Sequence, residues 1–170
     1  LKDKIKKLKD NYDFIIIDSS PSLNDEILST MLASDTLFVV TTPDYPTLSC
    51  TLRAAKLAKQ RGKPIAGIII NKIRSPFYEL SLKDIEKTAE LPVIARIPDD
   101  KEAVKALFTR IPITIYNKNS LISKEIGKLS AAMTNNTQIS FIKKVFQFHF
   151  RREEVNRELL KQTFYDPLFK

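Results

Sequence analysis

Four short apolar runs, separated by stretches with helical spacing, constrain the fold of this chain more than any other feature. The runs are largely β-branched and apolar on both faces, which is typical of buried strands in a parallel sheet. They span residues 14–17, 36–41, 65–70 and 93–97. Strands that alternate with helices pair in parallel through right-handed crossovers. The sequence therefore predicts an α/β fold, with a mostly parallel sheet covered by helices on both faces.

The stretches between these runs carry helix start and stop signals. Asn24 is a candidate cap for a helix through about Ser34, and Thr47 or Ser49 for a helix that stops near Gly62. Further helices are expected near residues 1–8, 80–89, 102–108 and 120–133. After Met133 the chain becomes polar and then basic and aromatic. We therefore expect one domain over residues 1–135 and a separate tail over 136–170.

Composition narrows the class of protein. The net charge of +8 favours anionic partners such as nucleotides, nucleic acid or acidic lipid surfaces without choosing among them. A single cysteine, Cys50, and a single histidine, His149, leave no disulfide framework and no Cys/His zinc site within the chain. No apolar stretch approaches the roughly 20 residues that cross a bilayer, and the charged start is unlike a signal peptide. The expected location is the cytoplasm.

Three of the predicted strands end in polar residues, at Asp18, at Asn71-Lys72 and at Pro98-Asp99-Asp100. The carboxyl ends of parallel strands meet at one edge of a sheet, where ligands of such folds bind. A carboxylate such as Asp18 suits Mg²⁺, directly or through a water, and the Asn71 amide can pair with an adenine edge. The pattern predicts a Mg-ATP site, with the backbone of Ser19 to Ser22 near the terminal phosphate and the Pro98 loop over the base.

Other interpretations of these residues remain open. Asp18 on its own could simply end a strand, and Asn71 could be an ordinary turn residue. Asn71-Lys72 also resembles the start of the guanine-binding motif of GTPases. That motif needs a carboxylate two residues further on, where this chain has Arg74, which has no acceptor. Adenine is therefore favoured over guanine.

Several motifs, taken in order, resemble those of the MinD and ParA family of deviant-Walker ATPases. Tyr12 to Leu23 resembles the family's switch II segment, a hydrophobic strand followed by Asp and a Ser/Pro turn. The other matching motifs are Thr42-Pro43-Asp44, Ile70-Asn71-Lys72, Ile97-Pro98-Asp99-Asp100, Val104, Ala106 and Ile111-Pro112. The resemblance covers about residues 8 to 133.

This resemblance implies an ATPase that dimerises around Mg²⁺ and ATP and uses hydrolysis in a positioning, division or partitioning cycle, with an activating protein partner possible. By position, Asp18 matches the catalytic, metal-binding switch II aspartate. Ser19, Ser20, Pro21 and Ser22 complete switch II. Asn71 and Lys72, with Pro98, Asp99 and Asp100, match the nucleotide-binding residues.

One departure from the family is large. The glycine-rich phosphate loop lies upstream of switch II in the family, whereas here few residues precede switch II and the first glycine is Gly62. Such a loop needs glycine conformations and a fixed lysine. We therefore expect a C-terminal portion of a longer ATPase that is inactive alone. The alternative is a noncatalytic binding module on the same scaffold, acting through its surface helices or its tail.

The tail combines aromatic and basic residues in an amphipathic pattern. A segment of this kind can lie on an anionic membrane surface, and it can equally pack on a protein partner or on its own domain. The candidate contact residues are Phe141, Lys143, Lys144, Phe146, Arg151 and Arg152. Nucleic acid is disfavoured because no recognition motif accompanies these charges.

Overall fold

The structure, a computed structural model, describes residues 2–19, 25–75 and 77–134. Within these residues it contains a three-stranded parallel sheet in the order β1-β2-β3. The strands are β1 (Leu37–Thr41), β2 (Ile65–Ile73) and β3 (Val93–Pro98). β2 is central and carries an unbroken run of six buried residues, which suits a strand with neighbours on both edges and helices on both faces. The predicted α/β fold is confirmed.

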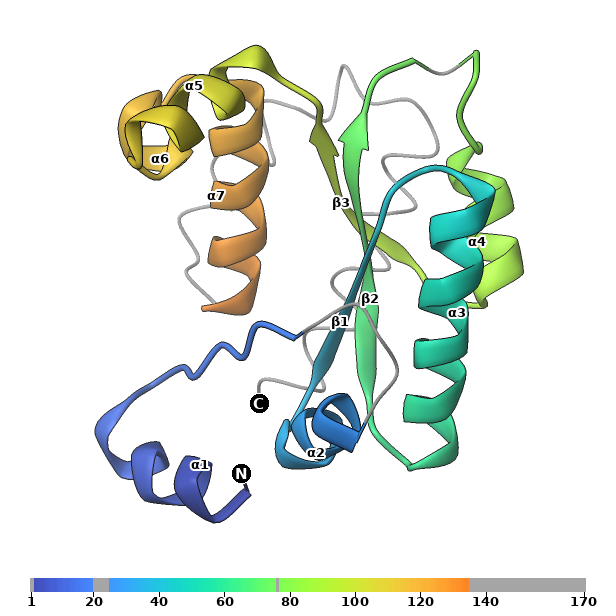
Figure 1. Cartoon of the computed structure of the whole chain (residues 1–170), viewed down its shortest axis with the longest axis vertical. Helices are drawn as coiled ribbons and strands as arrows, with labels where there is room; N and C mark the ends of the chain where they lie inside the picture. Colours follow the sequence, from blue (N-terminus) through green and yellow to red (C-terminus); the bar gives the residue numbers. More distant parts are fainter. Residues whose placement is uncertain (1, 20–24, 76, 135–170) are drawn as a thin grey trace.

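Helices cover both faces of this sheet (Figure 1). α3 (Tyr45–Gln60) and α4 (Leu82–Ala89) lie on one face, and α7 (Leu121–Met133) lies on the other against β3. The remaining helices are α1 (Lys2–Leu8), the 3₁₀ turn η1 (Lys9–Asn11), α2 (Asp25–Ala33), α5 (Lys101–Thr109) and α6 (Ile113–Tyr116).

The core follows the two faces of the sheet. On the α3/α4 side, Ile68, Ile70 and Val93 pack with Leu48 and Ile85, and α2 contributes further apolar side chains. On the α7 side, a smaller cluster joins strand residues such as Ile69 and Ile94 to the last turns of α7. The residues of the central strand are buried on both faces of the sheet. Close packing around them fixes the positions of the ends of β2 and β3.

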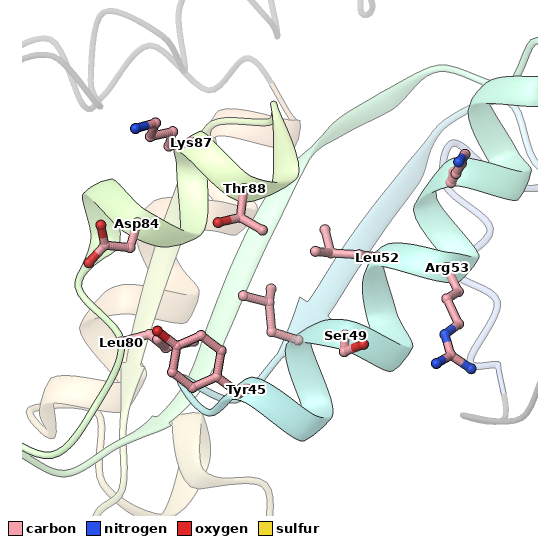
Figure 2. Close-up of a pocket in the computed structure, with 10 residues that line it drawn as sticks. Tyr45, Ser49, Leu52, Arg53, Leu80, Asp84, Lys87 and Thr88 are labelled. Carbon is pink, nitrogen blue, oxygen red and sulfur yellow. The ribbon is translucent and has the colours of Figure 1, made fainter.

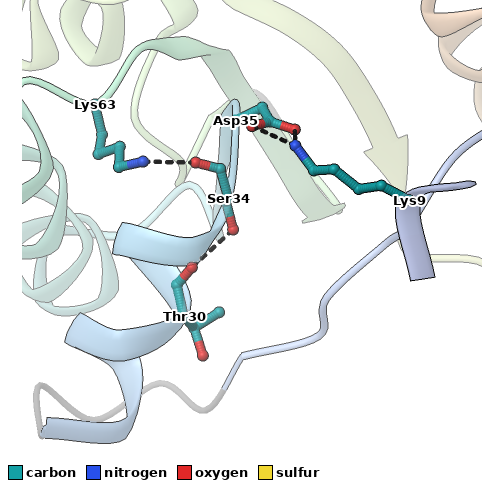
Figure 3. Close-up of polar contacts among 5 residues, drawn as sticks. All are labelled: Lys9, Thr30, Ser34, Asp35 and Lys63. Carbon is teal, nitrogen blue, oxygen red and sulfur yellow. Dashed lines mark hydrogen bonds and ion pairs between the residues drawn. The ribbon is translucent and has the colours of Figure 1, made fainter. Parts of the chain in front are cut away.

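The N-terminal helix is tied to the rest of the domain by a small polar cluster (Figure 3). The Lys9 ammonium lies 2.8 Å from a carboxylate oxygen of Asp35, in the turn between α2 and β1. Ser34 lies in the same turn. Its backbone oxygen accepts from Lys63, which precedes β2, over 2.8 Å, and its hydroxyl donates to the Thr30 carbonyl. The side chains of Lys9 and Asp35 are 49% and 80% exposed, so their pairing contributes no more than about 1 kcal/mol.

One predicted strand is wrong. Residues 14–17 are not part of a strand, and in the described residues no ladder pairs with them. Ile16 is 82% exposed and Phe14 is 47% exposed. A run that is apolar on both faces forms a central strand only when partners flank it on both edges. Among the described residues, no strand pairs with either edge of this segment.

The other boundaries differ by a few residues. α3 begins at Tyr45, ahead of the predicted Thr47 or Ser49, because Asp44 caps it and Pro46 fits its first turn. α4 begins after Ser81, whose hydroxyl accepts from the Asp84 N–H. The short helix α6 was not predicted. β2 extends through Asn71 and Lys72, which the sequence placed after the strand.

Candidate functional site

The structure brings two of the three predicted strand ends together. β2 and β3 are parallel neighbours, with Ile73 in register with Pro98. The Asp99 N–H donates to the Ile73 carbonyl over 2.9 Å, so the loop after β3 is bonded to the end of β2. Asn71-Lys72 and Pro98-Asp99-Asp100 therefore share one edge of the sheet, as the sequence predicted.

Asn71 and Lys72 occupy an irregularity in the ladder. Ile70 pairs with Arg96 and Ile73 with Pro98, so that Asn71 and Lys72 together face Ile97 alone. Lys72 has φ +57°, which is uncommon for a residue with a side chain. Extra residues of this kind bend a strand and redirect its side chains. The bulge explains how Asn71 can lie at the end of a buried strand and remain partly exposed.

The Asn71 side chain is oriented but not saturated. Its Oδ1 accepts the Lys72 N–H over 2.9 Å. The hydrogen bonds found among the described residues include none from its amide nitrogen, which leaves two donors and one acceptor lone pair for a ligand. An adenine edge presents both a donor and an acceptor. The chemistry of this side chain therefore fits a base.

An ion pair joins the two loops of this edge. Arg74 Nε lies 2.5 Å from Asp99 Oδ2, and the Arg74 N–H donates to Glu79 over 2.7 Å. The hydrogen bond with the Asp99 carboxylate raises the pKa of Arg74. The neighbouring Asp100 is also occupied, because its Oδ1 accepts the Glu102 N–H at the start of α5. Sequence reasoning used Arg74 only to exclude guanine and missed its pairing with Asp99.

Asp18 does not join this edge. The segment that contains it, residues 12–19, ends in the lower half of Figure 1, whereas the carboxyl ends of β2 and β3 point to the top. The predicted meeting of three strand ends is therefore wrong for the first of them, because residues 14–17 are not in the sheet. Of the proposed switch II residues, Ser19 is described, and Ser20, Pro21 and Ser22 lie outside the described residues, as does the whole predicted tail.

The described residues form no cluster of metal ligands. They include no group of three His, Cys, Asp or Glu side chains placed to hold a metal ion. Asp99 and Asp100 are engaged by Arg74 and by α5, as described above. The chain's three glycines, Gly62, Gly67 and Gly127, form no glycine-rich loop. The edge thus fits the base of a nucleotide, and no glycine-rich loop for its phosphates accompanies it among the described residues.

One buried donor near this edge has no partner. Arg96, two residues before Pro98 on β3, has its Nε buried and without an acceptor among the described residues. An unsatisfied buried N–H of this kind costs about 1–3 kcal/mol. An anionic oxygen from a ligand or from another protein segment would remove that cost. An arginine inside an apolar strand was the sequence signal that could have identified it.

A separate groove lies between α3 and α4 (Figure 2). Its volume is about 700 Å³. Leu48, Leu52 and Leu80 line it together with the cations Arg53, Lys56 and Lys87, and Tyr45, Ser49, Asp84 and Thr88 complete the lining. The groove is apolar between basic side chains. Sequence analysis did not identify it, because its residues come from two helices about thirty positions apart.

The start of α3 is stabilised by Asp44 from the Thr42-Pro43-Asp44 motif. Its carboxylate accepts from the Thr42 hydroxyl and from the Thr47 N–H, the latter over 2.9 Å. Both hydrogen bonds lower the pKa of Asp44, and the bond from the Thr42 hydroxyl has the larger effect. The resemblance placed this motif in family order, and in the structure it is a helix cap.

No helix in the part of the chain that the structure describes is long and apolar enough to cross a membrane.

Known proteins match this chain in sequence and in fold. The family model described as AAA domain matches residues 1–106. The septum site-determining protein MinD of Thermotoga maritima is 32% identical over 74% of this chain and 48% of its own length. An uncharacterized ATP-binding protein of Methanocaldococcus jannaschii is 28% identical, over 77% of this chain and 50% of its own. The chain thus spans about half the length of these relatives.

Solved structures agree. MinD of Pyrococcus horikoshii, in complex with Mg-ADP, superposes with a TM-score of 0.73 at 27% identity, covering 81% of this chain and 57% of that one. A ParA family ATPase of Chlorobium tepidum gives 0.65 at 29%, covering 74% and 52%. The same family is indicated by the order of strands and helices, by Asn71 and Pro98 at the strand ends, and by these matches. The chain belongs to the MinD/ParA family of P-loop ATPases.

Proposed function

We propose that this chain is the base-binding portion of a longer ATPase, in which the β2–β3 edge receives adenine. The observation that carries the proposal is the pairing of the Asn71 bulge with the Pro98–Asp100 loop, held by the Arg74–Asp99 ion pair. The Asn71 amide has free donors at this edge. The ATP-binding relatives and the Mg-ADP complex of the P. horikoshii protein support adenine as the base.

In that longer protein an upstream phosphate loop would hold the triphosphate, and Asp18 would be the switch II carboxylate that hydrolysis needs. Mg²⁺ would be held by the phosphates together with Asp18, directly or through a water. We further propose an ATP-dependent homodimer in a positioning, division or partitioning cycle, in the cytoplasm or at a membrane that the tail contacts. The septum-site role named for the T. maritima relative supports a process of this kind.

The test compares nucleotide binding with and without the upstream coding sequence. Residues 1–170 alone should bind Mg-ATP weakly in calorimetric titration, because most of the charge-assisted bonds to a triphosphate come from the phosphate loop. Restoring the in-frame upstream segment should give micromolar binding or tighter. Asn71→Ala in the longer protein should then weaken adenine preference, with Asn119→Ala as the matched control. Micromolar binding by residues 1–170 alone contradicts the proposal.

A noncatalytic binding module remains the second candidate, and the α3/α4 groove favours it. An apolar groove with a basic lining fits an amphipathic helix with acidic flanks. If the upstream sequence encodes no phosphate loop, this candidate replaces the first. Arg53→Glu with Lys56→Glu should then abolish binding of the partner that co-purifies with the wild-type chain, and Lys83→Glu, outside the groove, should not.

A further inference from the structure

Helix α5 presents its large apolar residues to solvent and its small ones to the protein. Phe108 is 90% exposed, Leu107 is 79% exposed and Val104 is 63% exposed, whereas Ala106 is only 2% exposed. The three exposed residues have the i, i+3, i+4 spacing of one helix face. A surface helix of a globular protein normally shows the reverse arrangement. We refer to Val104, Leu107 and Phe108 as the outer face of α5.

The exposed charges around this face are mainly positive. Lys101 and Lys105 on α5 and Arg110 at its end are exposed. The one acid within the helix, Glu102, is paired with Lys105 over 2.6 Å. Of the ion pairs found among the described residues, none involves Lys101 or Arg110. The outer face therefore combines protruding apolar side chains with unpaired cations.

The shape and charge of this face select among possible occupants. The three residues are 63–90% exposed, and two cavities formed by described residues lie on other elements, beside α3 and α4. A second copy docked face to face would bring the basic residues together, which is unfavourable. An anionic lipid surface needs no matching groove, accepts protruding Leu and Phe side chains and attracts lysine and arginine.

We propose that the outer face of α5 is a contact site for anionic membrane lipids, distinct from the C-terminal tail. Leu107 and Phe108 enter the boundary between headgroups and acyl chains. Lys101 and Arg110 remain at the level of the headgroup phosphates. A single short apolar face binds lipid only marginally, so this contact strengthens membrane binding in combination with another attachment.

The chain has no tryptophan, which allows a direct local measurement. Phe108→Trp in the 170-residue chain places one fluorophore on the outer face. Its emission should shift to the blue on vesicles of phosphatidylcholine and phosphatidylglycerol in equal parts, and not on phosphatidylcholine alone. The control is Phe77→Trp, because Phe77 is 87% exposed and lies on the loop before α4. Its emission should not change.

A second variant tests the energetics. Leu107→Glu with Phe108→Glu should weaken vesicle co-sedimentation by about tenfold or more, equivalent to about 1.4 kcal/mol, whereas Phe77→Glu with Tyr78→Glu should not. If the tail alone carries the chain to vesicles, co-sedimentation persists while the tryptophan at position 108 shows no shift, and the proposal is wrong. It is equally wrong if the chain does not bind these vesicles. If the emission of the tryptophan at position 108 is already blue-shifted without lipid, and the chain forms a dimer that Phe108→Glu dissociates, the outer face binds a second copy of the chain and the lipid proposal is wrong.

Discussion

Gly67, in the central strand, should be the least replaceable of the three glycines. A Cβ built there would lie 2.6 Å from Ile94 Cγ2 and 2.8 Å from the backbone oxygen of Pro92. The second neighbour is backbone, so it cannot move by rotating a side chain. Gly67 also has φ +154°, a value that residues with side chains rarely adopt. It lies where the β1–β2 register shifts, since Phe38 pairs with Gly67 while Leu37 pairs with Ile65.

These two effects set the expected size of the loss. Forcing an extra methyl into a packed core costs about 1–3 kcal/mol, and a strained backbone conformation adds about 1 kcal/mol or more. We expect Gly67→Ala to lower the free energy of unfolding by about 2–4 kcal/mol. At about 4 °C per kcal/mol for a domain of this size, the melting temperature should fall by roughly 8–16 °C.

The other two glycines serve as matched controls in the same urea and thermal unfolding assays. Gly127 lies inside α7, and a Cβ there meets nothing within 4 Å. Gly127→Ala should therefore raise stability by about 0.5–1 kcal/mol. Gly62 follows α3 with φ +65° in open space, so Gly62→Ala should cost about 1–2 kcal/mol from backbone conformation alone. If Gly67→Ala unfolds at the same midpoint as the parent, the reasoning from close contacts is refuted.

Three further predictions concern the cap, the site and the tail. Asp44→Ala should cost about 1 kcal/mol at neutral pH and Asp44→Asn much less, because asparagine keeps the cap. The pKa of Asp44 is lowered in the folded state, so its stabilising contribution is present above the unfolded-state pKa and is lost as pH falls through the folded-state pKa. The difference in unfolding free energy between the parent and Asp44→Ala, measured by urea titration, should therefore disappear under acid conditions. In a longer protein with a phosphate loop, Asp18→Asn should abolish turnover with little effect on nucleotide affinity, and parental turnover in a hydrolysis assay would show that Asp18 has another role. Phe146→Glu and truncation after Asn136 should both reduce ATP-dependent co-sedimentation of that protein with anionic vesicles, and unchanged sedimentation would leave the tail as a packing surface.

The sequence correctly predicted the strands that have a neighbouring strand and covering helices among the described residues. The runs at 36–41, 65–70 and 93–97 became β1, β2 and β3, because each finds a partner strand and covering helices among the described residues. Residues 14–17 have the same apolar character and pair with no strand among the described residues, so pattern alone could not decide their state. Local signals were also incomplete. The helix starts at Asp44 and Ser81 were displaced by a few residues, because several hydroxyl and carboxyl side chains near each start could serve as caps.

The site was predictable at the level of strand ends and not at the level of contacts. Parallel pairing of β2 with β3 was enough to place Asn71 beside Pro98. The Arg74–Asp99 ion pair depends on the bulge at Asn71-Lys72 and on the positive φ of Lys72, neither of which leaves a clear mark in the sequence. The outer face of α5 was likewise hidden, because i, i+3, i+4 apolar spacing predicts a face turned toward the core.

The structure gives a physical reason to treat base binding and phosphate chemistry as separable. The two loops at the β2–β3 edge are joined by the Arg74–Asp99 ion pair and by the bond from the Asp99 N–H to the Ile73 carbonyl. A preformed contact binds ground state and transition state alike. In a longer protein with a phosphate loop, loss of the Asn71 amide should therefore raise the KM for ATP more than it lowers kcat. Asp18 lies on a segment outside the sheet, so a catalytic role requires that segment to be placed by other parts of a longer protein. Its loss should then reduce kcat and leave affinity largely intact.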